Sequence, residues 1–465
     1  MERNREFSIT TGINMQNFLI QVREDRLPST NPVKAQESNA HIETATVAAR
    51  QFVQRLFRVL FFLHIILTAI LVIFLTVRGL LSAHRHHFHP KKWYPPLLTA
   101  TACSAIVAFT WQWITLRYPS RAIKAAFWIS PLLTCAVGIL LVLIGSAASL
   151  AMGSVAVVFS IIQSLYACWV NLRFNYAIKI LSVSTAFPPA KTTALVILSL
   201  VIGIVYSGFL VSGIGGATIT GTEIDTLFIL VILLSLIWCM QVMKNTLQVT
   251  VAHIKYIQLA READMDTKVA LRDTIKHLMG NILIGSAIVP ILTVIRGSAR
   301  AISLVAGGTD EFLFSCANCY SALASTLVNY GNRWGFVHVG VYNKGFVQAS
   351  MDTWELFRRA GLEPLIDSDL TGSFCFLSGI AGGAICALVG GIWTLTVHKS
   401  YATEVSIYAF LIGYFMFCGP QCRVAMAWPQ ACVSAYYVVY AENPQGPRFD
   451  PTIPVRIQEL QRYGA

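Results

Sequence analysis

Long apolar runs separated by short polar stretches dominate the chain from residue 59 onward. The first run, 59–77, is mostly apolar and is bracketed by Arg58 and Arg78. At 1.5 Å per residue, a helix of this length spans roughly 28 Å, which matches one bilayer hydrocarbon core. The pattern therefore predicts an all-α, polytopic integral membrane protein with about ten transmembrane helices. The ten candidate spans lie at about 59–77, 97–116, 125–144, 152–171, 193–212, 226–243, 278–295, 312–329, 371–397 and 405–440.

Two of the runs are longer than one crossing. The run from Ala125 to Val170 contains Gly145-Ser146 and Gly153-Ser154, where the chain can turn back. The last run is interrupted at Gly419-Pro420 and at Pro429, which predicts a broken or kinked helix. The carbonyl groups freed by such a break could bind a cation on a transport path, or neighbouring helices could satisfy them.

The polar stretches predict three parts of the chain. Residues 1–50 are rich in Ser, Thr, Asn, Gln and charge and lack an apolar period, so we expect a disordered cytoplasmic tail. Residues 51–440 form the transmembrane domain, and 441–465 a cytoplasmic C-terminal tail. Within the domain, 244–277 and 351–360 have apolar residues at helical spacing beside charged ones, which predicts helices lying on the inner surface.

Composition strengthens the membrane interpretation. Only 12% of the residues are charged, 55% are hydrophobic, and the mean hydropathy is +0.60. A soluble globular chain carries about 25% charge, so several soluble domains are excluded. The net charge of +12 could indicate nucleic-acid binding, but the ten spans place 27 Lys and Arg residues on the side of both termini and 7 on the other. That asymmetry predicts that both termini are cytoplasmic, and it leaves no reason to expect nucleic acid as a partner.

From about residue 165 to the C-terminus, the chain resembles the choline transporter-like family, and its plant members in particular. The most specific block runs from Asn332-Arg333-Trp334 through Tyr342–Ser350 to Asp352–Leu356. Further matches, in order along the chain, are Leu172–Leu181, Trp238 with Gln241 and Asn245, Gly280–Arg296, Asp367–Leu370, Pro429–Cys432, Tyr436-Tyr437 and Ala441–Pro444. The first 160 residues resemble the family only in topology.

The resemblance implies a transmembrane transporter of choline or a related small organic cation, such as a quaternary or primary ammonium compound. We expect the plasma membrane as its location, with an endomembrane as the alternative. Membrane lipids are expected partners, and a homo-oligomer is left open. The main alternative is a membrane scaffold or lipid-handling protein of the same fold without choline selectivity.

A quaternary ammonium group has no N–H donor, so a site for it needs aromatic faces. The aromatic residues of the predicted spans are therefore the candidates, and Gln241 lies three residues after Trp238, where it could contact the choline hydroxyl. The alternative is that such residues anchor span ends or fill the packing. The candidate substrate-binding residues are Trp238, Gln241, Trp169, Tyr166, Tyr414 and Trp428. Arg423, just after the predicted break, would repel a cation, so we expect it to pair with a carboxylate or to belong to an inner gate.

The remaining motifs indicate no enzyme. No nucleotide-binding loop and no nucleophile-base spacing is found, so we expect neither catalysis nor a cofactor. Four histidines within 84–89 could bind a metal, which would make a metal-ion transporter a third hypothesis. They lack a Cys or carboxylate partner, and Cys316-x-x-Cys319 has no second pair, so we predict no metal site.

Overall fold

The computed structural model describes residues 32–82, 90–145, 147–188, 191–217, 223–306, 311–397, 416 and 418–463. These residues are helical or lie in turns, and the described part contains no strand. The all-α prediction is confirmed. Seven of the described helices are long and apolar enough to cross a membrane. They are Val47–Leu81, Pro119–Leu143, Ser149–Thr185, Thr192–Ile214, Leu227–Ala260, Thr267–Ala299 and Glu363–Val389.

Each of these seven contains or overlaps one of the predicted spans. Two other predicted spans, 97–116 and 312–329, fall within α3 (Pro90–Arg117) and α11 (Glu311–Tyr330). The tenth, 405–440, lies partly outside the described residues. The count of ten and the cytoplasmic position of both termini stay predictions.

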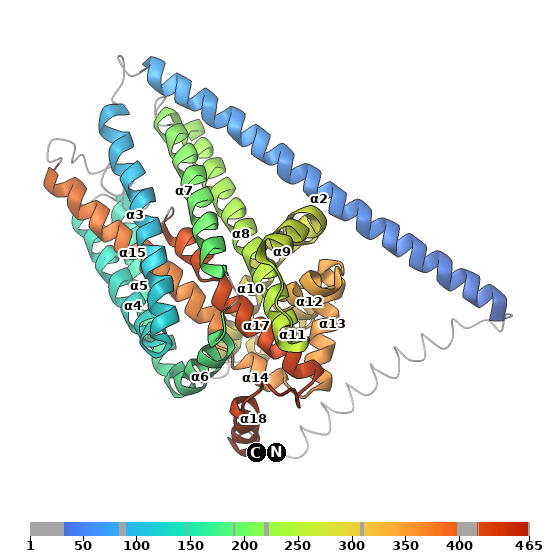
Figure 1. Cartoon of the computed structure of the whole chain (residues 1–465). Helices are drawn as coiled ribbons and strands as arrows, with labels where there is room; N and C mark the ends of the chain where they lie inside the picture. The colour runs from blue at the N-terminus through green and yellow to red at the C-terminus, as the bar shows by residue number, and fades with distance from the viewer. Residues whose placement is uncertain are drawn as a thin grey trace. The chain divides into compact units, whose positions relative to one another are not determined.

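The chain divides at Leu56 into two compact units, 1–56 and 57–465. Helix α2 (Pro32–Ser82) begins within the stretch predicted as a tail and continues across the division. The second unit holds the rest of α2 and all later helices (Figure 1). Its first half contains α3, α4 (Pro119–Ile144), α5 (Ala147–Val170), η1 (Asn171–Arg173), α6 (Phe174–Thr185) and α7 (Thr192–Ala217). Its second half contains α8 (Glu223–Ala260), α9 (Thr267–Asp273), η2 (Thr274–Leu278), α10 (Met279–Ala306), α11, α12 (Gly335–Tyr342), α13 (Phe346–Arg359), α14 (Glu363–Asp367), α15 (Thr371–Val397), α17 (Ala427–Glu442) and α18 (Thr452–Tyr463).

Two helices organise the second unit. Every residue of α17 from Ala427 to Ala441 is buried, and α17 contacts α6, α8, α12, α13 and α15. Helix α8 contacts α7, α10, α12 and α17. An apolar helix buried all round is typical of the centre of a helix bundle. The core is therefore built around the α8–α17 pair.

Helix α8 corrects one prediction from the sequence. The predicted span ends at residue 243 and is followed by a surface-lying helix, but α8 runs unbroken to Ala260. Gln248, Val249 and Thr250 are fully buried. The apolar spacing in this segment therefore faces the protein core rather than the membrane surface. The second predicted surface helix is found as α13, with Trp354 and Phe357 buried and Arg359 exposed.

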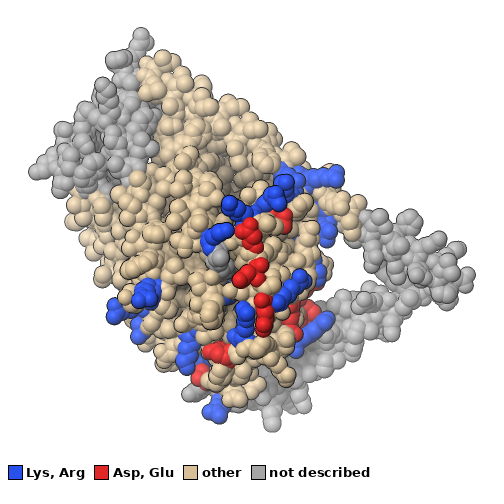
Figure 2. All heavy atoms as spheres, in the orientation of Figure 1, with Lys and Arg blue, Asp and Glu red and all other residues tan. Residues whose placement is uncertain are grey.

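Charged side chains are unevenly placed. On the face drawn in Figure 2, Lys, Arg, Asp and Glu gather over one half, and the other half is almost free of charge. A wide uncharged belt is what contact with a bilayer requires. Within the family-like block, Asn332 donates to the carbonyl of Ser350 at 2.9 Å and accepts from the backbone of Gly335 at 2.9 Å. These bonds join the start of α12 to α13.

Glycines allow α4 and α5 to pack closely. A Cβ built on Gly153 would lie 2.7 Å from the carbonyl oxygen of Gly138, and one built on Gly138 would lie 2.9 Å from a Val157 methyl group. Small residues at a helix interface let the backbones approach. The turn between the two helices is made at Gly145, whose φ of 83° favours glycine.

We expect Gly153→Leu to destabilise the protein, because the side chain would overpack the α4–α5 interface. Overpacking of this kind costs about 1–3 kcal/mol. The measurement is the melting temperature of the purified protein in detergent. The matched control is Gly297→Leu, since a Cβ at Gly297 meets nothing within 4 Å. Equal melting temperatures for the two variants would contradict the close packing.

Candidate functional site

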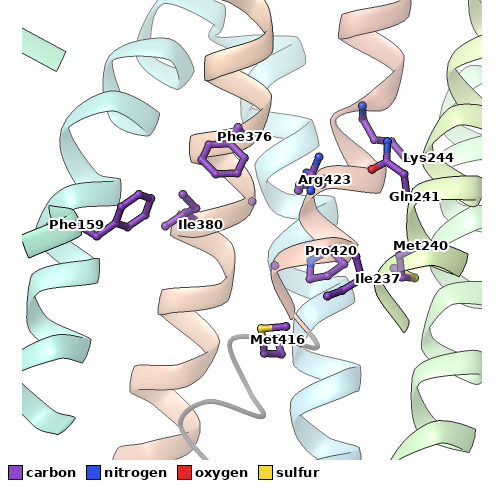
Figure 3. A pocket seen from close by; sticks show the side chains of 12 residues that line it. Phe159, Ile237, Met240, Gln241, Lys244, Phe376, Ile380, Met416, Pro420 and Arg423 are labelled. Carbon is purple, nitrogen blue, oxygen red and sulfur yellow. The ribbon is translucent and has the colours of Figure 1, made fainter. Parts of the chain in front are cut away.

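A cavity of about 270 Å³ lies between α5, α8, α15 and the helical residues 418–425. We call it the α5 cavity. Its lining is mostly apolar and includes Phe159, Met240, Phe376 and Ile380. The polar side chains in its wall are those of Gln241, Lys244 and Arg423, which lie opposite Phe159 in Figure 3. A mostly apolar pocket with a few polar groups is typical of a small-molecule site.

A second cavity of about 560 Å³ lies next to the first and extends to α10, α11 and α14. We call it the α10 cavity. Four residues line both cavities: Gln241, Lys244, Phe376 and Arg423. These four residues form a shared wall between the two spaces. A solute that passes from one cavity to the other must pass this wall.

Arg423 is held in the shared wall by its neighbours. Its guanidinium carbon lies 5.8 Å from the ring centre of Phe376. Its side-chain stem crosses Gly379 of α15, where a Cβ would collide with the stem. In the described part of the chain no carboxylate forms an ion pair with Arg423, so the predicted carboxylate partner is not found there. The alternative, a place in a gate, stays a prediction.

The other arginines of the α10 cavity have carboxylate partners. Arg296 donates to Asp367 at 2.5 Å. Arg333 forms an ion pair with Asp369, whose side chain is almost fully buried, and Asp369 also accepts from the Thr371 hydroxyl at 2.7 Å. Charge-assisted bonds of this kind hold the loop before α15 in place. The two carboxylates are therefore engaged by two arginines.

The sequence predicts interruptions of the last span at Gly419-Pro420 and at Pro429, whereas the structure has Gly419 and Pro420 in a helix and a turn between the two predicted points, at Met426. Residues 418–425 are helical, Met426 forms a turn, and α17 begins at Ala427. The thiol of Cys375 lies 3.4 Å from the Met426 carbonyl and donates to it. Pro429 falls in the first turn of α17, where the missing N–H is tolerated. The Met426 carbonyl at the turn thus has a side-chain partner from α15.

The six residues predicted to bind substrate do not meet in one cavity. Gln241 lies in the shared wall, where its amide donates to Asn245 at 3.4 Å. Trp238 lines a different cavity, between α2 and α8, where its ring centre is 4.9 Å from that of His64. Only Gln241 among the described members lines the α5 cavity.

The remaining predicted residues are spread over other surroundings. The hydroxyl of Tyr166 is 2.7 Å from that of Ser373. Trp169 is 59% exposed, with Arg173 over its ring at 4.8 Å. Trp428 is buried in α17, and its indole nitrogen has no hydrogen-bond partner among the residues that the structure describes. Tyr414 lies outside the described residues, as do the histidines of 84–89. Within the described part of the chain, no group of three or more potential metal ligands is found.

Lys244 and Phe376 are cavity residues that the sequence analysis did not single out. The sequence places Lys244 at the start of the predicted surface segment 244–277, but it is 8% exposed on α8. The signal that could have found it is the apolar spacing of α8, which continues through Lys244 to Tyr256. A lysine inside a long apolar helix is expensive unless it faces protein or water.

A polar cluster joins α8, α12 and α17 beyond the α10 cavity. The carboxylate of Glu442 accepts from Tyr256 at 2.6 Å and from Tyr342 at 3.2 Å, and His338 lies 3.5 Å from it. Burial alone would raise the pKa of Glu442. The adjoining His338 imidazole and Tyr256 hydroxyl outweigh burial and hold that pKa below its usual value.

Comparison with known proteins gives one family and several fungal relatives. A family model described as plasma-membrane choline transporter matches residues 154–445, more than half of the chain. The chain is 24% identical over 219 residues to Protein pns1 of Aspergillus fumigatus. The aligned region covers 45% of this chain and 41% of the relative. It is 25% identical over 190 residues to Protein PNS1 of Gibberella zeae, and that aligned region covers 38% of this chain and 35% of the relative. The chain therefore matches less than half of the length of these relatives.

The Glu442 cluster predicts a pH effect on stability. A carboxylate whose pKa is lowered in the folded protein stabilises the fold at any pH above its unfolded pKa of about 4.3. This stabilisation is lost as the pH falls from there through the lower pKa of the folded protein. We expect the melting temperature of the protein to fall as the pH is lowered from about 5 to about 3, and to fall less in Glu442→Gln. The control is Glu262→Gln, because Glu262 is exposed. Identical pH profiles for Glu442→Gln and the unchanged protein would contradict the role of the cluster.

Proposed function

Because the chain belongs to the choline transporter-like family, we propose that it carries choline, or a related small ammonium compound, across the membrane. The chain is an integral membrane protein of a transporter family. The plasma membrane is the proposed location. Membrane lipids and a second copy of the chain stay proposed partners.

The observation that carries the proposal is the pair of adjoining cavities at the broken last span. Gly419, Pro420 and Arg423 line the α5 cavity shortly before the turn at Met426, and the two cavities meet at residues from α8, α15 and 418–425. Discontinuous helices at membrane depth are common where transporters bind their substrates. The shared wall is therefore the proposed point of control on the path.

The α5 cavity has a suitable end for an ammonium group. Phe159 of α5 and Phe376 of α15 line it. An aromatic face attracts a cation by about 0.5–2 kcal/mol, and more strongly where water is excluded. Of the residues that the sequence predicted for the substrate, Gln241 is the one in position to contact a hydroxyl group in this cavity.

The direct test is uptake of labelled choline into vesicles that contain the purified protein. We expect uptake above that of empty vesicles, with greater uptake when the interior is negative, because about 2.3 kcal/mol acts on each charge per 100 mV. Ethanolamine as a second labelled compound measures selectivity. Uptake equal to that of empty vesicles for both compounds would overturn the proposal.

The proposed path predicts the effect of filling the α5 cavity. Ile380 is buried in its wall, so Ile380→Phe should narrow the cavity and reduce uptake about tenfold or more. The control on the same helix is Val389→Phe, since Val389 is 58% exposed and lines neither cavity. Melting temperatures show whether both variants are folded. Unchanged uptake in a folded Ile380→Phe would place the path elsewhere.

A further inference from the structure

We propose that the shared wall binds the anionic group of a zwitterionic ligand, a compound with a phosphate or carboxylate as well as an ammonium group. The inference rests on the proposed transporter function and names the class of its substrate. It starts from Lys244 and Arg423, two cations that line both cavities.

The charge in the cavity walls is not balanced. Lys244 is 8% exposed, and neither it nor Arg423 forms an ion pair within the part of the chain that the structure describes. The α5 cavity is lined by these two cations and by no carboxylate among its described residues. A charge removed from bulk water needs a partner of opposite sign to offset the loss of hydration.

The carboxylates of the neighbouring cavity have other partners. Asp369 forms its ion pair with Arg333, and Asp367 with Arg296. The α10 cavity therefore has four cationic side chains and two carboxylates among its described lining residues. The excess of positive charge falls on Lys244 and Arg423, in the shared wall.

The two cations are presented on fixed parts of the fold. Lys244 projects from the middle of α8, which contacts the buried helix α17. The stem of Arg423 crosses Gly379, and its guanidinium lies over Phe376. A planar guanidinium and an ammonium group held in place are well suited to phosphate and carboxylate oxygens.

The Phe159 ring of the α5 cavity lies away from these charges. Figure 3 shows Phe159 on one side of the cavity and Lys244, Gln241 and Arg423 on the other. A ligand with an ammonium group near Phe159 and an anionic group at the shared wall would satisfy both ends. A ligand with only positive charge would meet repulsion from both cations, and it would compete with Arg423 for the Phe376 ring.

The test is calorimetric binding to the purified full-length protein, which needs no transport. The probes are choline, phosphocholine, glycine betaine and inorganic phosphate. We expect phosphocholine and betaine to bind at least tenfold more tightly than choline. Equal or tighter binding of choline would overturn the inference. Absence of choline uptake by vesicles would instead overturn only choline as the substrate in the proposed function.

Variants locate the binding in the shared wall. Lys244→Gln and Arg423→Gln should each weaken phosphocholine binding at least tenfold. Neither should weaken choline binding, because each removes a cation that repels choline. The matched controls are Lys276→Gln and Arg272→Gln, whose side chains are exposed and line neither cavity. Unchanged phosphocholine affinity in a folded Lys244→Gln would overturn the inference. If a variant fails to fold, a competition experiment on the unchanged protein replaces it. Inorganic phosphate should displace bound phosphocholine and leave choline bound. Failure of phosphate to displace phosphocholine would overturn the assignment of the anionic group to the shared wall.

The anionic group could belong to a free compound or to a lipid headgroup. Phosphocholine affinity is therefore compared in nanodiscs of phosphatidylcholine and in nanodiscs of an uncharged galactolipid. Weaker binding in phosphatidylcholine would identify the lipid headgroup as a competing ligand of the same site. Equal binding would identify the free compound. Lack of phosphocholine binding in both kinds of nanodisc would overturn the inference.

Discussion

The burial of α17 on every side is the constraint on which the rest of the second unit depends. In a helix without a lipid-facing or water-facing surface, the polar side chains depend on neighbouring segments for hydrogen bonds. Tyr437 meets the hydroxyl of Tyr176 at 2.9 Å, and Tyr436 donates to Asp450 at 3.1 Å. These contacts determine which helices can surround α17. The position of α17 in turn places residues 418–425, and with them Arg423.

The polar groups of the described core fall into two kinds. Asp369 and Glu442 are carboxylates with several partners each, and they join loops and helices that are distant in sequence. Lys244 and Arg423 have no carboxylate partner within the described part of the chain, and they line cavities instead. The first kind gives the bundle its specific arrangement. Burying the unpaired cations Lys244 and Arg423 is unfavourable in free energy if the protein binds no ligand. This desolvation penalty is the physical reason to assign these two side chains to a ligand.

The sequence predicted the helices well because a bilayer requires long apolar segments, and hydropathy measures that directly. It predicted an interrupted last span from Gly419, Pro420 and Pro429, but the turn lies between these positions, at Met426, and Gly419 and Pro420 are helical. It did not predict the site, because the direction in which each helix faces depends on its neighbours. Trp238 has the same helical spacing whether it faces α2 or the α5 cavity. The burial of Lys244 was likewise hidden, since a cation at the end of an apolar run is also the usual sign of a span boundary.

The glycines of α15 have a consequence for motion. The stem of Arg423 fills the space above Gly379, and the sulfur of Cys422 lies where a Cβ of Gly382 would be. Residues 418–425 are therefore seated on α15 with little room to slide, because packed interiors resist continuous deformation. A rearrangement that opens either cavity would carry α15 and this short helix together, as one rigid body. Sliding would then occur between this rigid body and α8. Arg423 lies on the rigid body and Lys244 lies on α8.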